Sequence, residues 1–295
     1  MIDDVDFYLM DLKSRFDKIK LNTYYLSYSG GKDSHFLYWF IKEYLKRDDI
    51  KIVGCNTYME HHEILKRILK NSDIVLGPKL KPFEIKEKYG IPCFSKMQDS
   101  IIDRYQRGSR AKSTLERIYG IDTSGRDWTK FKLNKTAKTM LLDDTLHRVS
   151  PNCCKYLKKE PFKKFEKETG LKPILGVRGM ESVLRVTKYQ SCFTKNKTFT
   201  PIYDLSDELL NKIYNKYNIE IPKVYEHVCR TGCMGCPYGS YKHDTEKELM
   251  FINDNQFEFV CKYFKESYEV LGIDINKIRN NRRTQYKEMT GTTNE

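Results

Sequence analysis

The chain has 295 residues, with 53 Lys and Arg against 40 Asp and Glu, so its formal net charge is +13. Apolar residues make up 39 % of the chain and aromatic residues 13 %, which excludes a disordered chain of low hydrophobicity. The longest purely apolar run, Phe36–Ile41, is far shorter than the roughly 20 residues that a membrane-spanning helix needs. Because the first residues are acidic, they do not resemble a signal peptide, and we expect a cytoplasmic protein with no membrane partner.

Helical and extended patterns alternate over the first ninety residues. An amphipathic helix is predicted over residues 1–20, where apolar side chains recur at helical spacing. The predicted elements that follow are strand 23–29, helix 33–45, strand 50–57, helix 60–69, strand 73–76 and helix 82–89. Strands that alternate with crossover helices in this way predict an α/β fold with a doubly wound parallel sheet.

The centre of the chain is strongly basic. Ten Lys and Arg and three Asp and Glu fall within residues 104–138, a net charge of +7 that is over half of the total. Gly and Ser interrupt the stretch, so we predict a helical insert with exposed turns at about 104–140. Basic and interleaved aromatic side chains favour a nucleic-acid partner, DNA or tRNA, whereas a solvated helical face is the alternative.

The remainder of the chain is predicted to be mainly helical, with one further strand. The predicted elements are a helical region 153–168, a strand 173–177, a helix 209–217 and a last helix 246–271. We therefore expect an N-terminal helix over 1–22, an α/β domain over 23–203 and a smaller helical, cysteine-bearing region over 204–295. A basic tail from Lys277 to Lys287 contains no acidic residue, and we expect it to contribute to binding a polyanion.

A glycine-rich turn follows the first predicted strand. The backbone N–H groups of a turn between a strand and a helix bind anions, and glycines let phosphate oxygens approach closely. An ordinary turn capped by Asp33 is the alternative. The residues that we predict to bind phosphate are Ser29, Gly30, Gly31, Lys32, Asp33 and Ser34.

This string, SGGKDS, resembles the PP-loop of the ATP pyrophosphatase (adenine nucleotide α-hydrolase) superfamily. The resemblance implies a doubly wound sheet with ATP and Mg²⁺ at the carboxyl ends of its strands. It also implies a reaction that releases pyrophosphate. By position, Asn56 and Thr57 correspond to the segment that lines the adenine pocket. Asp33 would help to orient magnesium, which prefers oxygen ligands.

Two further segments resemble one branch of that superfamily. Residues 153–162 (CCKYLKKEPF) resemble the sulfonucleotide reductase signature CCxxRKxxPL, although Leu157 replaces its arginine. Relatives in DNA phosphorothioation use a C-x-x-x-L-K form. Residues 176–185 (GVRGMESVLR) resemble the G-[IV]-R-x-x-E-S-x-x-R motif of the same group. The resemblance implies that Lys158 offsets charge during the reaction, and that Gly176, Arg178 and Arg185 face the nucleotide or a polyanionic substrate.

Five of the nine cysteines cluster in the sequence. Cys154 precedes Cys233 by 79 positions, which resembles the spacing in the iron–sulfur members of this family. The resemblance implies a 4Fe–4S cluster, with Cys229 as an alternative ligand. Four thiolates also suit a structural zinc ion, so zinc is the alternative cofactor. The expected ligands are Cys153, Cys154, Cys233 and Cys236. The cysteines predicted to be packing thiols are Cys55, Cys93, Cys192 and Cys261.

Three functions follow from these features. The first is an ATP-dependent sulfur-transfer enzyme, in which an acceptor oxygen attacks the α-phosphorus of ATP and sulfur from a cysteine desulfurase or persulfide then displaces AMP. The second is an APS or PAPS reductase that produces sulfite, although the tail lacks the cysteine of the reductases' mobile ECGxH segment. The third is a non-catalytic module that senses a nucleotide or binds nucleic acid.

Overall fold

The computed structural model describes residues 3–122, 124–126, 132–179, 189–228, 231–241 and 245–290, the last six of these and residues 240–241 as backbone only. The chain divides into two compact units. The first consists of Met1–Asn56, His62–Gly77 and Glu160–Lys223. The second consists of Thr57–His61, Pro78–Lys159 and Val224–Glu295. The domain boundaries expected from the sequence stay predictions.

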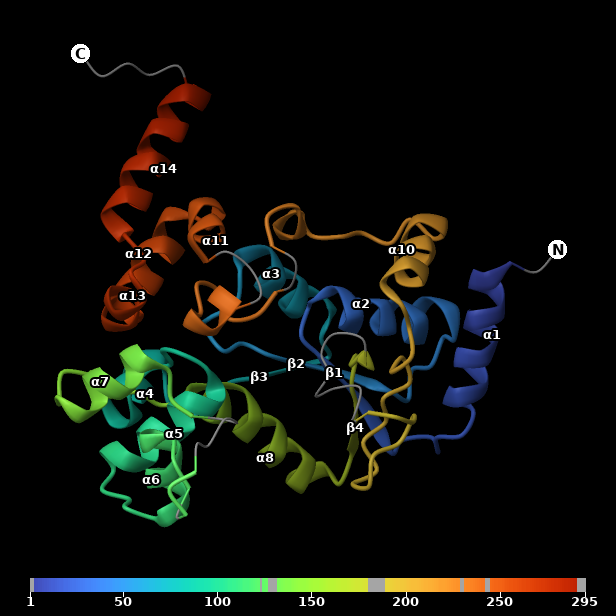
Figure 1. Cartoon of the computed structure of the whole chain (residues 1–295). Coiled ribbons are helices and arrows are strands. Elements are labelled where there is room, and N and C mark those ends of the chain that lie inside the picture. The colour runs from blue at the N-terminus through green and yellow to red at the C-terminus, as the bar shows by residue number, and fades with distance from the viewer. Residues whose placement is uncertain are drawn as a thin grey trace. The chain divides into compact units, whose positions relative to one another are not determined.

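The first unit contains a four-stranded parallel sheet with the strand order β3-β2-β1-β4 (Figure 1). In its centre, Leu26 of β1 lies beside Ile52 of β2 and Ile174 of β4. This order confirms the predicted parallel α/β architecture. The strands are β1 (Tyr24–Tyr28), β2 (Lys51–Cys55), β3 (Ile74–Leu76) and β4 (Lys172–Ile174).

The fourth strand is shorter than predicted. It ends at Ile174 rather than at residue 177. The backbone N–H of Leu175 donates to the carbonyl of Phe199, and the N–H of Val177 donates back to the carbonyl of Leu175. This tight turn takes the chain out of the strand.

Helices cover both faces of the sheet, as expected for a doubly wound fold (Figure 1). Alternate side chains of a strand point to opposite faces. Tyr25 therefore packs against α8 (Glu160–Thr169), where its hydroxyl donates to Glu166 at 2.9 Å. On the opposite face, the hydroxyl of Tyr28 lies 2.9 Å from His35 Nδ1 in α2 (Lys32–Trp39) and accepts from α3 (His62–Asn71).

Two more helices of the first unit pair with each other. The helix α1 (Asp4–Phe16) buries Leu9, Leu12 and Phe16. Its acidic first turn forms ion pairs with α10 (Asp207–Lys216), such as Lys212 to Asp4 at 2.8 Å. The predicted helix 33–45 is present, but its second half is a π-helix, η1 (Phe40–Tyr44).

The second unit is helical. One hydrophobic core lies within residues 93–149, and a second contains the cysteine loop and the C-terminal helices. The helices are α4 (Pro82–Tyr89), α5 (Lys96–Gln106), α6 (Lys112–Tyr119), α7 (Lys135–Leu142), α11 (Thr245–Phe251), α12 (Asp254–Tyr263), α13 (Lys265–Leu271) and α14 (Ile275–Thr290). Three short segments are the π-helix η2 (Lys155–Lys159) and the 3₁₀ helices η4 (Lys223–Glu226) and η5 (Pro237–Tyr241). Of these, η4 begins at the last residue of the first unit and continues into the second.

The single last helix predicted over 246–271 is wrong, because this region forms three helices. The side chain of Asn253 accepts from the N–H of Gln256 at 2.9 Å and so caps the start of α12. An asparagine in this role favours a new helix start over continuation of the previous one. Phe264 then ends α12 and precedes α13. Within the described part of the chain, no helix combines the length and the apolar character needed to cross a membrane.

Candidate phosphate site and thiol cluster

The predicted phosphate loop lies between β1 and α2. Helix α2 starts at Lys32, and its N-cap, Gly31, supplies no side-chain hydrogen bond to the first turn. The loop is closed by Ser34, whose hydroxyl accepts from the N–H of Ser29 at 3.2 Å, donates to the carbonyl of Gly31 at 3.0 Å and contacts the Ser29 hydroxyl. The positive end of the helix dipole therefore lies at this loop, and no side chain caps the helix start. Such a helix start is suited to binding an anion.

Two glycines fit tightly around this loop. Gly30 has φ +72°, and a β-carbon there would lie 3.0 Å from the side chains of Ile64 and Ile68 in α3. Gly176, which follows β4, lies against the start of α2, where a β-carbon would be 3.0 Å from the backbone N of Ser34. The carboxyl ends of β1 and β4 are adjacent, so a side chain at residue 176 would press on the backbone at the start of α2.

Arg178 reaches the loop from this second strand end. Its Nε donates to Asp33 at 2.8 Å and its Nη1 donates to Asp207 at 2.8 Å, while its side chain is only 8 % exposed. Burial alone would lower the pKa of Arg178, but the two carboxylates outweigh it and raise the pKa above its ordinary value. The arginine is thus a fixed cation beside the loop. Arg185 lies outside the described residues.

The remaining loop cation, Lys32, contacts helix α10. Its ammonium donates to Asn211 at 2.5 Å and lies 5.6 Å from the centre of the Tyr214 ring. The Tyr214 hydroxyl donates to the backbone carbonyl of Lys32 at 2.6 Å. Burial lowers the pKa of Lys32, and the charge of Arg178 lowers it further. The partners of these cations on α10, which are Asp207, Asn211 and Tyr214, were not identified from the sequence. They lie 29 or more residues after Arg178, and no local sequence pattern marks a contact over that distance.

His35, on the first turns of α2, predicts a pH dependence of stability. Burial lowers its pKa to about 3, with further lowering by Arg67 and Lys70. The unfolded chain binds a proton on this histidine below about pH 6.5, whereas the folded chain does not. The histidine therefore destabilises the fold progressively as the pH falls, by about 2 kcal/mol between about pH 7.5 and pH 5.

Urea unfolding at these two pH values tests this effect. The His35→Gln variant should lose less stability on acidification than the wild type, by the same 2 kcal/mol or so. His62→Gln is the matched control, since His62 is exposed. An equal acid dependence in the wild type and in His35→Gln contradicts the prediction.

The predicted adenine-pocket residues differ in their surroundings. Asn56 follows β2, and its backbone N–H donates to Leu76. The Thr57 hydroxyl and N–H both donate to the carboxylate of Glu60, at 2.5 and 3.0 Å, and the side chain is buried. These contacts occupy both hydrogen-bond donors of Thr57, while contact with adenine stays a prediction.

The second unit gathers four of the predicted cysteine ligands. Cys153 is part of the buried C-terminal core, and Cys154, Cys233 and Cys236 pack against that core. The loop between the last two turns at Gly235, whose φ of +59° favours glycine and whose carbonyl accepts from the Tyr268 hydroxyl. The four thiols therefore share one environment. Cys229 lies outside the described residues.

The thiols of this cluster have shifted acidities. A hydrogen bond from Cys153 lowers the pKa of Cys154 to about 6 despite burial, aided by Lys96 and Lys158. Burial raises the pKa of Cys233 to about 12 and that of Cys236 well above its usual range. Among the described residues, no three His, Cys, Asp or Glu side chains are arranged as a metal site. Thiolates are the ligand type that an iron–sulfur cluster or zinc takes, so only the chemistry of these four side chains, and not their arrangement, suits such a group.

A buried carboxylate supports the cysteine loop. Asp99 accepts from the N–H groups of Cys93 and Phe94 at 2.7 and 3.0 Å, and from the Tyr238 hydroxyl at 2.7 Å. Burial raises the pKa of Asp99 to about 6. Asp99 thus joins the start of α5 to the chain just after Cys236, a role that the sequence pattern did not indicate.

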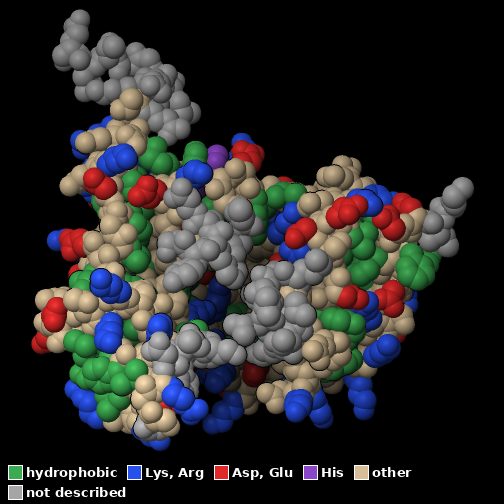
Figure 2. Space-filling view, in the orientation of Figure 1, with side chains coloured by type: hydrophobic (Ala, Val, Ile, Leu, Met, Phe, Trp, Pro, Cys, Tyr) green, Lys and Arg blue, Asp and Glu red, His purple; other side chains and the backbone are tan. Residues whose placement is uncertain are grey.

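Helix α6 lies within the basic stretch 104–138, and α7 begins in it. Figure 2 shows Lys and Arg side chains at the surface in this part of the second unit. The Arg110 guanidinium lies 3.9 Å from the centre of the Tyr105 ring, and Lys138 lies 5.7 Å from that of Tyr119, which is 45 % exposed. Trp128 and Phe131 of the same insert lie outside the described residues.

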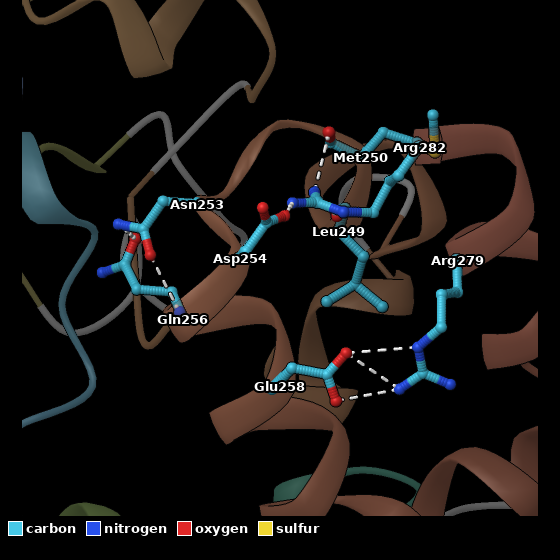
Figure 3. A network of polar contacts seen from close by, with 8 residues as sticks. All are labelled: Leu249, Met250, Asn253, Asp254, Gln256, Glu258, Arg279 and Arg282. Atoms are coloured by element: carbon cyan, nitrogen blue, oxygen red, sulfur yellow. Dashed lines mark hydrogen bonds and ion pairs between the residues drawn. The ribbon is translucent and has the colours of Figure 1, made fainter. Parts of the chain in front are cut away.

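The basic tail forms α14, and two of its arginines make structural contacts (Figure 3). Arg279 donates to Glu258 at 2.9 Å. Arg282 donates to Asp254 at 2.6 Å and to the carbonyls of Leu249 and Met250. These pairs attach α14 to α11 and α12, so the two arginines have a structural use that the charge pattern alone did not reveal. The side chain of Lys287 lies outside the described part.

Comparisons with known proteins assign no family. No family model and no curated protein matches the chain. One similar solved structure is a phosphoadenylyl-sulfate (PAPS) reductase from Candida auris in a phosphate complex, with 11 % identity, 74 % of this chain and 83 % of that chain covered, and a TM-score of 0.40. Another is an NH3-dependent NAD synthetase from Campylobacter jejuni subsp. jejuni in complex with nitrate, with 13 % identity, 90 % and 94 % covered, and a TM-score of 0.34. Because likenesses at this level carry no functional argument, the function rests on this chain's own residues.

Proposed function

We propose that this protein is an ATP pyrophosphatase-type sulfurtransferase, which binds ATP and Mg²⁺ at Ser29–Ser34 and releases pyrophosphate. The observation that carries the proposal is the convergence of Lys32 and the buried Arg178 on a helix start whose N-cap glycine offers no side-chain acceptor. Phosphate groups suit such a set of backbone N–H groups and cations. The sequence SGGKDS supports ATP as the source of these phosphates.

In the proposed reaction, an acceptor oxygen attacks the α-phosphorus of ATP. The bond from that phosphorus to the pyrophosphate oxygen breaks, and the acceptor becomes adenylated. Negative charge develops on the departing pyrophosphate, where Lys32 and Arg178 would offset it. The same role for Lys158 rests on the resemblance of residues 153–162 alone. Asp33 would orient magnesium. Gly176 and Arg185 would face the nucleotide, with Asn56 and Thr57 at the adenine.

The thiol cluster is proposed to serve the second half of the reaction. Sulfide from a donor such as a cysteine desulfurase would attack the activated acceptor atom and displace AMP. If the donor is a persulfide, its terminal sulfur would displace AMP to form a mixed disulfide with the acceptor, which a thiol reductant would then cleave to leave the sulfur on the acceptor. Cys153, Cys154, Cys233 and Cys236 would hold a 4Fe–4S cluster, with Cys229 as the alternative ligand and zinc as the alternative metal. When only three of these thiolates bind it, such a cluster would leave one iron open to bind sulfide, whereas four thiolates would saturate all its irons.

A nucleic-acid acceptor, DNA or tRNA, is proposed from the charge distribution. The insert carries Lys138 beside the exposed ring of Tyr119, a combination that suits a phosphate backbone and an unpaired base. The reductase alternative is less favoured, because Cys261, the last cysteine of the chain, is only 8 % exposed within α12. A mobile attacking thiol needs more access than this.

The test is a reaction of anaerobically reconstituted protein with ATP, a labelled persulfide donor, and tRNA or DNA. We expect pyrophosphate release and sulfur incorporation that depend on each other. Asp33→Ala should abolish both, whereas Asp48→Ala, at a side chain 96 % exposed, should leave both unchanged. Sulfite from APS or PAPS without pyrophosphate release would support the reductase instead, and ATP binding without turnover would support a sensing module.

A further inference from the structure

Two side chains of helix α10 accept hydrogen bonds from the two cations at the phosphate loop, Lys32 and Arg178. Asp207 accepts from Arg178 Nη1 at 2.8 Å, and Asn211, one helical turn later, accepts from Lys32 Nζ at 2.5 Å. The two acceptors lie on one side of α10, since residues four apart are neighbours on a helix surface. A carboxylate and an amide oxygen thus stand where negatively charged phosphate oxygens would be bound.

The position of these acceptors is fixed by the rest of α10. Ser206 caps the helix through the N–H of Leu209, and Tyr214 donates to the backbone of the loop at Lys32. Lys212 and Lys216 form ion pairs with the first turn of α1. The helix therefore holds Asp207 and Asn211 against the loop by contacts that do not involve the two cations.

Breaking the ion pair between Arg178 and Asp207 has different consequences for the two side chains, because one is buried and the other is exposed. The arginine is 8 % exposed and keeps its bond to Asp33, so it stays in place. Asp207 is 77 % exposed, so water can solvate its carboxylate once it is displaced. An incoming phosphate carries more charge than one carboxylate and can replace it at modest cost.

We propose that Asp207 and Asn211 are a built-in competitor for the phosphate groups of the ligand, and that they set the affinity of the loop. The inference rests on the proposed phosphate site. Asp207 lowers the affinity for anions because its carboxylate must leave Arg178 first. The loop thereby keeps its cations paired until a ligand of sufficient negative charge arrives.

The test is calorimetric titration of the full chain with sodium pyrophosphate. Asp207→Asn should bind pyrophosphate about fivefold more tightly than the wild type, because an exposed carboxylate in an ion pair competes with about this strength. Asn211→Ala should bind it about twofold more tightly. Glu208→Gln is the matched control, since Glu208 is equally exposed on the same turn but pairs with Lys212 at 3.1 Å. This control should stay within about twofold of the wild type.

Unchanged or weaker binding by Asp207→Asn overturns the inference, and weaker binding would identify Asp207 as a ligand contact instead. The failure of the proposed function looks different. If neither pyrophosphate nor ATP binds the wild type, and Arg178→Gln changes nothing, the phosphate site itself is wrong and the competitor falls with it. Retained circular dichroism spectra show that the variants are folded.

Discussion

Replacing Arg178 with glutamine should reduce ATP-dependent pyrophosphate release by about 100-fold or more. Removing one preorganised group that stabilises developing charge typically costs a factor of this size. Arg178 is buried beside the loop and held by Asp33. A surface cation could therefore not take its place unless the surrounding residues moved. The variant should also bind pyrophosphate more weakly, because the neutral amide offers no charge-assisted hydrogen bond.

Arg47→Gln is the matched control for this experiment. Arg47 is also a partly buried arginine of the first unit, 19 % exposed, and it pairs with Asp49 at 2.5 Å rather than with the phosphate loop. We expect it to retain activity within about twofold, since such a pair contributes modestly to stability. A loss of less than about tenfold in Arg178→Gln, with the wild-type fold retained, would show that this arginine does not stabilise the reaction.

Replacing Cys236 with serine should remove most of the bound metal. Anaerobically reconstituted wild-type protein is expected to contain about four iron atoms per chain and to absorb broadly near about 400 nm, as thiolate-bound clusters do. Cys236 packs with the other three thiols, and serine supplies a poor ligand for iron in place of a thiolate. Iron and zinc analysis with the absorption spectrum measures the change without relying on activity.

Cys192→Ser is the control for the metal measurement, because Cys192 belongs to the first unit and lies outside the cluster. It should keep its iron. Stoichiometric zinc without iron would replace the iron–sulfur proposal with a structural zinc site. Equal metal content in Cys236→Ser and Cys192→Ser would show that Cys236 is not a metal ligand.

The sequence predicted the sheet because local patterns carry the information. Apolar strands such as 23–29 alternate with helices, and short crossovers leave few parallel arrangements for them. The phosphate loop was predictable for the same reason, since SGGKDS lies between a strand and a helix. The break at Asn253 was missed because the apolar pattern continues through the start of a new helix, while the asparagine cap is a single residue.

The contacts of the candidate site were harder to predict. Arg178 lies 145 residues from Asp33, and Asp207 a further 29 residues from Arg178, so their pairing depends on which strand ends are adjacent in the sheet. The motif indicated that Arg178 faces an anion but gave no sign that Asp207 is its partner. The charge pattern similarly gave no sign that Arg279 and Arg282 bind carboxylates of α12.

A crystal structure of the full chain with a non-hydrolysable ATP analogue and Mg²⁺ tests the central claim most directly. The account predicts phosphate groups at the backbone N–H groups that start α2, in contact with Lys32 and Arg178, with the Arg178–Asp207 bond broken. Phosphate groups bound elsewhere, or an Arg178 still paired with Asp207 beside a fully bound nucleotide, would contradict it.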